Sequence, residues 1–365
     1  MKNKNKLLAS SLLAVAIASP VWAEEEKVLN IYNWYDYIGA NTIAEFEQET
    51  GIKVNYDMFE SSEVLEAKLV AGGTGYDIVV PSSGQIERYK DLGVFLPLDK
   101  SRFTLMDNLD QEILERLAVQ DPGNTYALPW SWGTVGIGYN VDLLESVLPN
   151  PPADSWALIF DPQYASKVAE CGIGFLDSPS EVFPIALQYL GLDPNSTDSD
   201  DIAKATELLK EARKHIKYFN SAQLLDDLVT SEVCVVMDYN GNVSIGMMRA
   251  EEAGLDIQLA YSIPKEGTII WFDTMAIPSD APHPDNAHLF IDFMMRPESS
   301  AAITNSVYFA SPNTAAESLI DPAILADPGI YPPEDVKKNL FNLKMLPPKV
   351  TRKYNRNWTT VKAGI

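Results

Sequence analysis

Rings and carboxylates occur together at two places in this sequence. A Trp-Tyr-Asp-Tyr run begins at Trp34, where an apolar alternation ends, and Trp271 lies two residues before Asp273 in a second apolar stretch. An aromatic face attracts a cation and covers hydrocarbon, and a carboxylate neutralises an ammonium group. Both places are therefore typical of a site for a ligand that is part cation and part hydrocarbon. The alternative for the first run is that Trp34 and the tyrosines are ordinary half-buried aromatic residues that bind no ligand.

Single polar residues at the ends of predicted elements are further candidates. Asp273 lies inside an apolar strand, where a carboxylate is costly unless a backbone donor or a cationic ligand pairs with it. Glu181 opens a predicted helix over 182–190, so it either favours the helix dipole or faces the ligand. Ser82 follows a predicted strand and either caps the next helix or offers its hydroxyl to the site. The sequence leaves both alternatives open for each residue.

Residue patterns for catalysis and for transition-metal binding are missing from the sequence. His215, His283 and His288 are the only histidines, and there is no HExxH motif, His/Cys cluster, Gly-x-Ser-x-Gly elbow, Walker loop or dinucleotide fingerprint. A hydrolase would also need a nucleophile with a base beside it. We therefore expect no enzyme activity, no metal site and no cofactor.

The first 23 residues have the pattern of a secretory signal peptide. Three lysines precede an apolar run from Leu7 to Ala18, and Ala23 is followed by three glutamates. The run is too short to span a bilayer. We predict cleavage after Ala23 and export of the mature chain.

The chain is strongly acidic. It has 51 acidic and 28 basic residues, which gives a formal net charge of −23. Such a surface repels nucleic acid and anionic lipid and attracts cations. We expect no nucleic-acid partner, but acidity also aids solubility and does not by itself identify a ligand.

Cys171 and Cys234 are the only cysteines. An even count in an exported chain suggests a disulfide, and the absence of a Cys-x-x-Cys spacing argues against redox chemistry. The bridge would stabilise the fold by roughly 4 kcal/mol, because it restricts the unfolded chain.

Predicted strands and helices alternate along the chain. This order is typical of an open, wound α/β sheet, and the length suits two units. Three glycines in the stretch 126–140 indicate a crossing between the two units, with a plain buried strand as the alternative. The stretch 333–358 is expected on the surface. Strands are predicted over 27–31, 52–56, 76–81, 168–175, 234–237, 256–263 and 268–278, and helices over 41–50, 62–70, 182–190, 198–214, 224–229, 244–253 and 286–295.

Four motifs together resemble the polyamine-binding proteins of bacterial ABC importers. They occur in matching order and spacing across nearly the whole predicted mature chain, and they are Asn33-Trp34, Val80-Pro81-Ser82, Leu176–Phe183 and Trp271–Pro278. The resemblance implies an α/β, two-lobed periplasmic binding protein fold of type II. Each lobe would be an open wound sheet flanked by helices, with a hinged cleft between the lobes.

The resemblance also implies how the chain is divided and where it works. After the signal peptide at 1–23, lobe 1 would comprise 27–133 and 266–310, and lobe 2 would comprise 134–265 and 311–365. The protein would be a periplasmic monomer whose partners are a polyamine and an inner-membrane ABC permease.

By the same resemblance, ten residues are expected at the ligand. Trp34 and Trp271 match the aromatic walls of the family's sites, and Glu181 and Asp273 match its acids for ammonium groups. An acid from each lobe would then hold the ligand and favour closure. The complete set is Trp34, Tyr35, Asp36, Ser82, Glu181, Tyr239, Asn242, Trp271, Asp273 and Phe309.

Three positions depart from the family pattern. Asn242 stands where putrescine binders have an aspartate, and Tyr35 replaces a small hydroxyl residue, so both changes weaken an assignment to putrescine. Ser178 stands where spermidine binders have an aspartate, which favours a diamine. We expect putrescine as the ligand, with spermidine as the second candidate and another cationic amine, such as cadaverine or agmatine, as the alternative.

Other ligands for such a fold fit the sequence less well. Ferric sites of this fold usually have adjacent tyrosines, and no Tyr-Tyr pair occurs here. An amino-acid site would need an arginine for the carboxylate, and none lies in the matched motifs. A sensor that acts on a receptor instead of a transporter would have the same binding residues.

Overall fold

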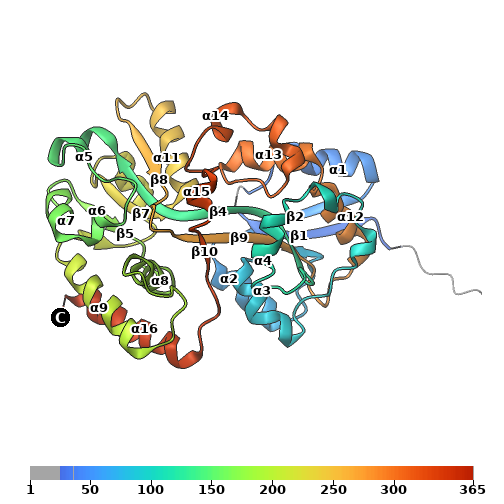
Figure 1. Ribbon diagram of the computed structural model, residues 1–365. Helices are drawn as coiled ribbons and strands as arrows, with labels where there is room; N and C mark the ends of the chain where they lie inside the picture. Colours follow the sequence, from blue (N-terminus) through green and yellow to red (C-terminus); the bar gives the residue numbers. More distant parts are fainter. Residues whose placement is uncertain (1–24, 36, 365) are drawn as a thin grey trace, which may run out of the picture.

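The computed structural model describes residues 25–35 and 37–364. The expected signal peptide and Asp36 lie outside these residues. Figure 1 shows two lobes side by side, joined by long strands through the middle of the molecule. No helix in the described ranges has the length and hydropathy needed to cross a membrane.

The first lobe is built as the alternating pattern predicts. Strands β1, β2 and β3 are parallel, with β1 in the middle, and helices α1 and α2 connect them in sequence. Leu29 and Ile31 of β1 are completely buried, which is why this strand alternates. The elements are β1 (Val28–Trp34), α1 (Thr42–Thr50), β2 (Lys53–Phe59), α2 (Ser62–Ala71), β3 (Ile78–Val79), α3 (Ser83–Tyr89) and α4 (Gln111–Leu117).

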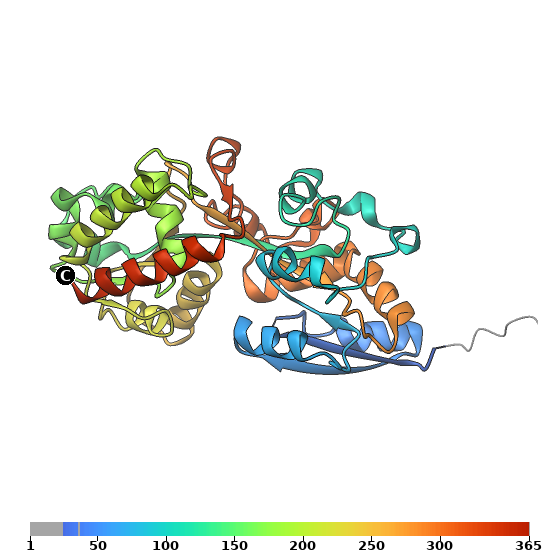
Figure 2. The same ribbon diagram turned by 90° about the horizontal axis from the view of Figure 1, so that it is seen from below.

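Strand β4 (Ala127–Asn140) connects the two lobes. Its first half pairs antiparallel with β9 (Ile269–Ala276), and its second half, from Val135 onward, pairs antiparallel with β7 and β8. Figure 2 shows these strands passing from one lobe into the other. The stretch 126–140 is thus both the buried strand and the crossing that the sequence left as alternatives. Eight strands of the described sheet form one path in the order β2-β1-β3-β9-β4-β7-β5-β6, while β8 pairs with β4 and β10 (Phe341–Asn342) pairs with β9 off this path.

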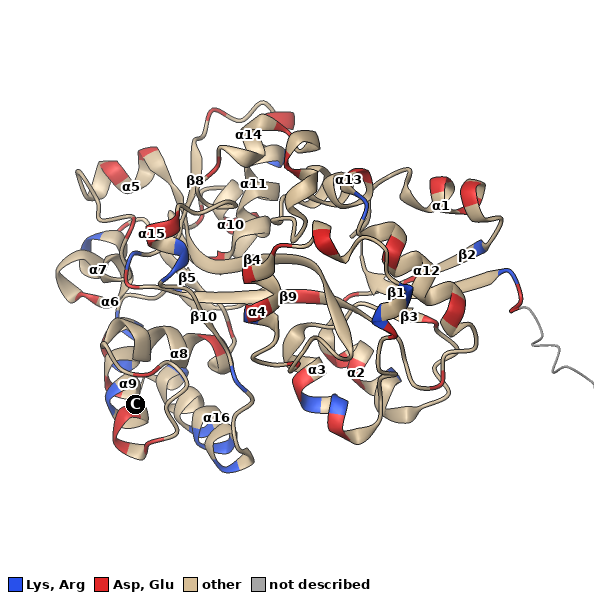
Figure 3. Cartoon of the chain, turned by 45° about the vertical axis from the view of Figure 1, so that its right-hand side comes forward, with Lys and Arg blue, Asp and Glu red and all other residues tan. Residues whose placement is uncertain are grey.

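The second lobe places its sheet between two sets of helices, with α8 and α9 on one side and α10 and α11 on the other (Figure 3). The largest buried apolar cluster fills this lobe and continues along β4 and β9. The elements are α5 (Val141–Val147), α6 (Ala157–Phe160), α7 (Pro162–Val168), β5 (Ile173–Phe175), α8 (Pro179–Tyr189), α9 (Ser199–Arg213), β6 (Tyr218–Phe219), α10 (Leu224–Val229), β7 (Val235–Tyr239), α11 (Asn240–Glu252) and β8 (Leu259–Ser262).

Four predicted elements of this lobe are wrong at their beginnings: the strand expected over 256–263 begins at Leu259, the helix expected over 182–190 begins at Pro179, and two others differ by more. The strand expected over 168–175 begins only at Ile173, because Asp161 caps and Pro162 opens a helix that runs through Val168. The helix expected over 244–253 begins four residues earlier, at Asn240. This earlier start places Asn242 in the first turn of α11.

The C-terminal stretch corrects the expectation of a surface segment. Helix α16 carries lysines and arginines on its outside (Figure 3), but its inner face is buried against α8 and α9. Tyr354 and Trp358 are 1% and 4% exposed, and Tyr354 stacks on Phe183 of α8. The late elements are α12 (Pro284–Met294), α13 (Pro297–Val307), the 3-10 helix η4 (Thr314–Leu319), α14 (Pro322–Leu325), α15 (Glu334–Lys337), β10 (Phe341–Asn342) and α16 (Pro348–Ala363).

The predicted disulfide is confirmed. Cys171 and Cys234 are bonded, with their Cα atoms 5.5 Å apart. Cys171 follows α7 and Cys234 precedes β7, so the bridge joins the entrance of β5 to the entrance of β7. It therefore fixes the end of the sheet opposite to the one at which β7 reaches Tyr239.

Candidate ligand-binding site

A continuous line of side-chain contacts runs between two acids, Asp273 and Glu181. The Tyr37 hydroxyl donates a hydrogen bond to Asp273. The Tyr37 ring contacts the Phe309 ring edge-on, with 5.8 Å between the ring centroids. Phe309 in turn meets Trp271 edge-on at 4.8 Å. Trp271 meets Tyr239 edge-on at 6.2 Å, and the hydroxyl of Tyr239 donates to Glu181. Four rings thus lie between a carboxylate from β9 and a carboxylate from α8.

Asp273 forms the first end of this line. It lies on β9 between Ser131 of β4 and Ser82, with which it makes an isolated backbone bridge. The Tyr37 hydroxyl donates to Asp273 Oδ2 at 3.0 Å and shares a second, short hydrogen bond with Ser131. Burial raises the pKa of Asp273 to about 7, although the hydrogen bond from Tyr37 acts in the opposite direction. The protein's own partner of this acid is therefore a hydroxyl and not a backbone donor, which was one of the two alternatives that the sequence left open, the other being a cationic ligand.

Glu181 forms the second end. It is the third residue of α8, which begins at Pro179 after Ser178. Its Oε1 atom accepts the Tyr239 hydroxyl at 2.7 Å. Burial raises the pKa of Glu181, and the hydrogen bonds from Ser178 and Tyr239 offset part of that rise. The carboxylate is thus held by hydroxyl groups and by no basic side chain among the residues that the structure describes.

Two glycines make room for the rings between the acids. A Cβ atom on Gly133 would lie 2.4 Å from the ring of Trp271, and one on Gly241 would lie 2.0 Å from the ring of Phe309. Both distances are far inside van der Waals contact. Glycine is therefore required at these two positions for Trp271 to lie against β4 and for Phe309 to lie against the start of α11.

Asp238 is an acid of this region that sequence reasoning missed. It lies one residue before Tyr239 on β7, is 1% exposed, and accepts Asn242 Nδ2 at 3.0 Å and the Tyr239 N–H at 2.8 Å through Oδ1. Burial, together with the charge of Glu181, raises the pKa of Asp238 to about 7. The sequence did contain a pattern that indicates a site here, because the run from Asp238 to Asn242 places polar groups directly after an apolar strand. Tyr37 was missed likewise, although it closes the first aromatic run.

The other expected residues are placed less centrally. Trp34 ends β1 and packs on Phe59 at 4.5 Å between ring centroids, and it makes no ring pair with Trp271 in the described structure. Its indole Nε1 is buried and has no hydrogen-bond partner among residues 25–35 and 37–364. Tyr35 is 63% exposed. Ser82 is the residue before α3, and its N–H donates to Gln85 at 3.1 Å, which is the helix-capping alternative.

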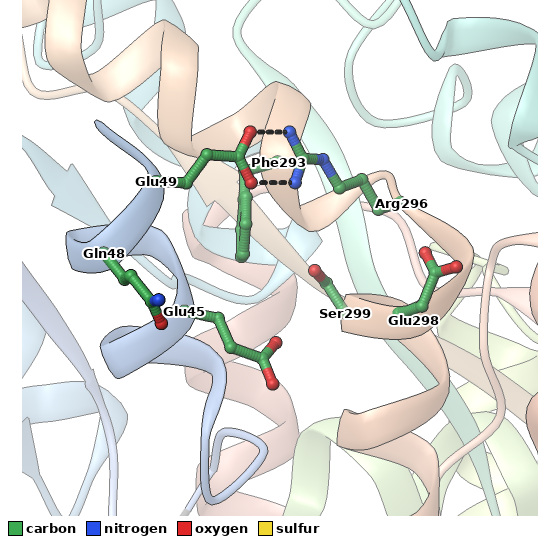
Figure 4. A pocket seen from close by; sticks show the side chains of 7 residues that line it. All are labelled: Glu45, Gln48, Glu49, Phe293, Arg296, Glu298 and Ser299. Carbon is green, nitrogen blue, oxygen red and sulfur yellow. Dashed lines mark hydrogen bonds and ion pairs between the residues drawn. The ribbon is translucent and has the colours of Figure 1, made fainter.

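Two surface hollows lie away from this line. One lies between α1 and the α12–α13 corner, where Glu49 forms a two-pronged ion pair with Arg296 above Phe293 (Figure 4). The other lies between the end of α13 and α14. No group of three or more His, Cys, Asp or Glu side chains in the described ranges is arranged to hold a metal ion.

Comparison with known proteins identifies the family. The model of the bacterial extracellular solute-binding proteins matches residues 41–332. The chain belongs to this family. It is 48% identical over 360 residues to the putrescine-binding periplasmic protein PotF of Escherichia coli, with 98% of this chain and 97% of that protein covered. It is 44% identical over 365 residues to the putrescine-binding periplasmic protein SpuD of Pseudomonas aeruginosa, with both chains covered completely.

A solved structure confirms the fold class. The crystal structure of the spermidine/putrescine ABC transporter substrate-binding protein PotD from Streptococcus pneumoniae superposes with a TM-score of 0.84 at 30% identity. The superposition covers 93% of this chain and 99% of that one. The chain thus has the two-lobed, type II fold of the solute-binding proteins, as the resemblance implied.

Proposed function

We propose that this protein captures a polyamine in the periplasm and delivers it to an inner-membrane ABC permease without catalysing a reaction. Putrescine is the first candidate and spermidine the second. The observation that carries the proposal is the line of four rings between Asp273 and Glu181, two acids that have no lysine or arginine partner among the described residues. Carboxylates buried without a cation are costly, and a ligand cation would remove that cost.

The chemistry of a polyamine matches this line group by group. Each ammonium group can donate charge-assisted hydrogen bonds to a carboxylate. The methylenes between the ammonium groups pack against aromatic faces, and each cation–π contact contributes about 0.5–2 kcal/mol. Trp34 and Tyr35 would then join the site from the lobe 1 side when the lobes close. The names of the putrescine-binding relatives support this choice of ligand.

Closure of the lobes would couple binding to delivery. Asp273 belongs to the predicted lobe 1 and Glu181 to the predicted lobe 2. A ligand that binds both acids has more contacts in the closed state, so it shifts the population toward that state. A permease that recognises the closed form would receive only loaded protein.

Calorimetric titration of refolded, ligand-free protein tests the proposal. The panel contains putrescine, cadaverine, agmatine and spermidine, with a sugar, an amino acid and ferric ion as controls. We expect heat from the amines, with putrescine binding most tightly, and none from the controls. Binding of a control with no response to any amine would overturn the proposal, and preference for cadaverine or agmatine would replace putrescine as the ligand.

A further inference from the structure

Asp238 and Asn242 form a pair that the line of rings and acids does not include. Asp238 is 1% exposed on β7, whereas Asn242 is partly exposed in the first turn of α11. The Asn242 amide donates through Nδ2 to Asp238 Oδ1 at 3.0 Å. The second oxygen of Asp238, Oδ2, is buried and has no hydrogen-bond partner in the described structure.

The hydrogen bond fixes the orientation of the Asn242 amide. A primary amide has donors on nitrogen and an acceptor on oxygen. Because Nδ2 bonds to the buried acid, Oδ1 faces the other way and is left to accept from a donor on the exposed side. Without an acid at position 238, either end of the amide could face outward.

The charge of Asp238 matters because of where α11 begins. The N-terminal end of a helix carries a partial positive charge, which repels an ammonium group. Asp238 lies directly before this end and accepts the N–H of Tyr239, the residue that precedes the helix. An ionised Asp238 therefore offsets the helix dipole at the position where Asn242 would meet a cation.

We propose that Asp238 is a positioning residue for a ligand ammonium, holding the Asn242 carbonyl oxygen toward the ligand and supplying a negative charge behind it. This inference rests on the proposed function. Asn242 would contact the ammonium, and Asp238 would act through it. The ligand class is an amine whose cationic end reaches the first turn of α11.

The surroundings of Asp238 agree with this role. The titratable groups that face it are Glu181 of α8, Tyr218 of β6, Tyr239 at the end of its own strand and Tyr261 of β8. Asp227 of α10 lies beyond Tyr218. None of these groups is basic, so the ligand is the only cation that this proposal places near the acid.

The test is a double-mutant cycle with putrescine, measured by calorimetry on the ligand-free full chain. Asp238→Asn keeps the shape of the side chain and removes its charge, and Asn242→Ala removes the amide. We expect each change to weaken Kd about tenfold, which corresponds to the loss of one hydrogen bond to a charged group. Because one residue acts through the other, the double mutant should weaken binding clearly less than the product of the two factors.

Thermal melting without ligand separates positioning from a structural role. Ionising Asp238 in the folded state is unfavourable, so Asp238→Asn should melt no lower than the wild type at pH 8 while it binds putrescine less tightly. Asp77→Asn is the matched control, because Asp77 is a buried acid with four hydrogen bonds in lobe 1. This control should lower the melting temperature and leave Kd unchanged. Asp238→Ser takes the place of Asp238→Asn if the latter does not fold.

The outcomes distinguish this inference from the proposed function. Wild-type protein that binds no amine would overturn the proposed function and this inference with it. A wild type that binds putrescine, together with an Asp238→Asn variant within twofold of it, would overturn the inference alone. Independent, multiplying effects of Asp238→Asn and Asn242→Ala would also overturn it.

Discussion

Asp77 and Asp273 are two aspartates of the predicted lobe 1 that are held in opposite ways. Asp77 is completely buried and accepts four hydrogen bonds, from the backbone and side chain of Asn30 and of His283. Asp273 is half-buried and, among the described residues, accepts one hydrogen bond, from the hydroxyl of Tyr37. The first acid ties β1 to the start of α12 and is satisfied by the fold itself. The second acid is left under-partnered by the fold, which is what a cation-binding residue requires.

The contrast suggests a way to separate structural acids from the acids expected to bind the ligand. Burial alone does not separate them, because Asp238, at 1% exposure, is about as buried as Asp77. The number of donors that the protein itself provides does separate them, since an under-partnered carboxylate is stabilised only when a ligand supplies the missing charge. Asp238 belongs with Asp273 by this criterion, because its Oδ2 has no partner among the described residues.

The largest expected effect comes from the under-partnered acid. Asp273→Ala should weaken putrescine binding by about 3–5 kcal/mol, because one side of a buried charge pair is removed. Calorimetry should therefore detect no binding at ordinary ligand concentrations, while the ligand-free variant melts as the wild type does. Full-strength binding by this variant would show that the site is elsewhere.

The satisfied acid should behave in the opposite way. Asp77→Asn replaces an acceptor oxygen with an amide group that faces the donors of Asn30 and His283, so we expect a loss of about 2–3 kcal/mol in the free energy of unfolding. Urea unfolding of the ligand-free protein measures this loss. The Kd for putrescine should stay within twofold of the wild type, and a large loss of affinity would remove the distinction between the two acids.

Changes in pH should move stability and affinity in opposite directions. Burial raises the pKa of Asp273 from 3.8 to about 7, so between these values the folded protein holds a proton that the unfolded chain has lost. The stability contribution of this group therefore falls as pH rises through that window. Binding of a cation needs the ionised acid, so the affinity for putrescine should increase about tenfold from pH 6 to pH 8. Asp273→Asn and Asp238→Asn should each flatten the stability profile, and an unchanged profile would contradict the assignment.

The smallest expected effect is that of the aromatic wall. Trp271→Leu keeps an apolar side chain but removes the ring that Phe309 and Tyr239 meet edge-on. The loss of one cation–π contact should weaken putrescine binding by about 0.5–2 kcal/mol. Leu289→Ala, at an exposed position on α12, serves as a control for handling and should bind like the wild type. If Trp271→Leu and Leu289→Ala had the same effect on Kd, the Trp271 ring would make no specific contribution to putrescine binding.

Much of the fold could be predicted from local patterns. The buried alternation at Leu29 and Ile31 predicts β1, and the glycines of 126–140 indicate the crossing strand, because both signals act over a few neighbouring residues. The start of β5 was predicted too early, because Asp161 and Pro162 begin a helix that takes up the first residues of the expected strand. The start of α11 was predicted too late, because the polar residues from Asn240 onward carry no helical pattern of apolar residues. The disulfide followed from a count of two cysteines and not from their spacing.

The site could be predicted only in part. Motif resemblance pointed to Glu181, Trp271 and Asp273, but the hydrogen bond between Tyr37 and Asp273 joins residues 236 positions apart, and no local pattern contains it. The role proposed for Asp238 depends on Asn242, four residues further along, which lies in the first turn of α11 although the prediction had placed it outside the helix. The tertiary fold decides which residues form hydrogen bonds with these acids. Local sequence patterns do not show these partners.

A crystal structure of the protein with putrescine bound would show whether the ligand lies between the two acids. We expect one ammonium nitrogen within hydrogen-bonding distance of Asp273, the other on the lobe 2 side near Glu181 and Asn242, and the methylenes between Trp34 and Trp271. A ligand bound away from these acids, or an anion lying between the lobes in its place, would overturn the proposed site.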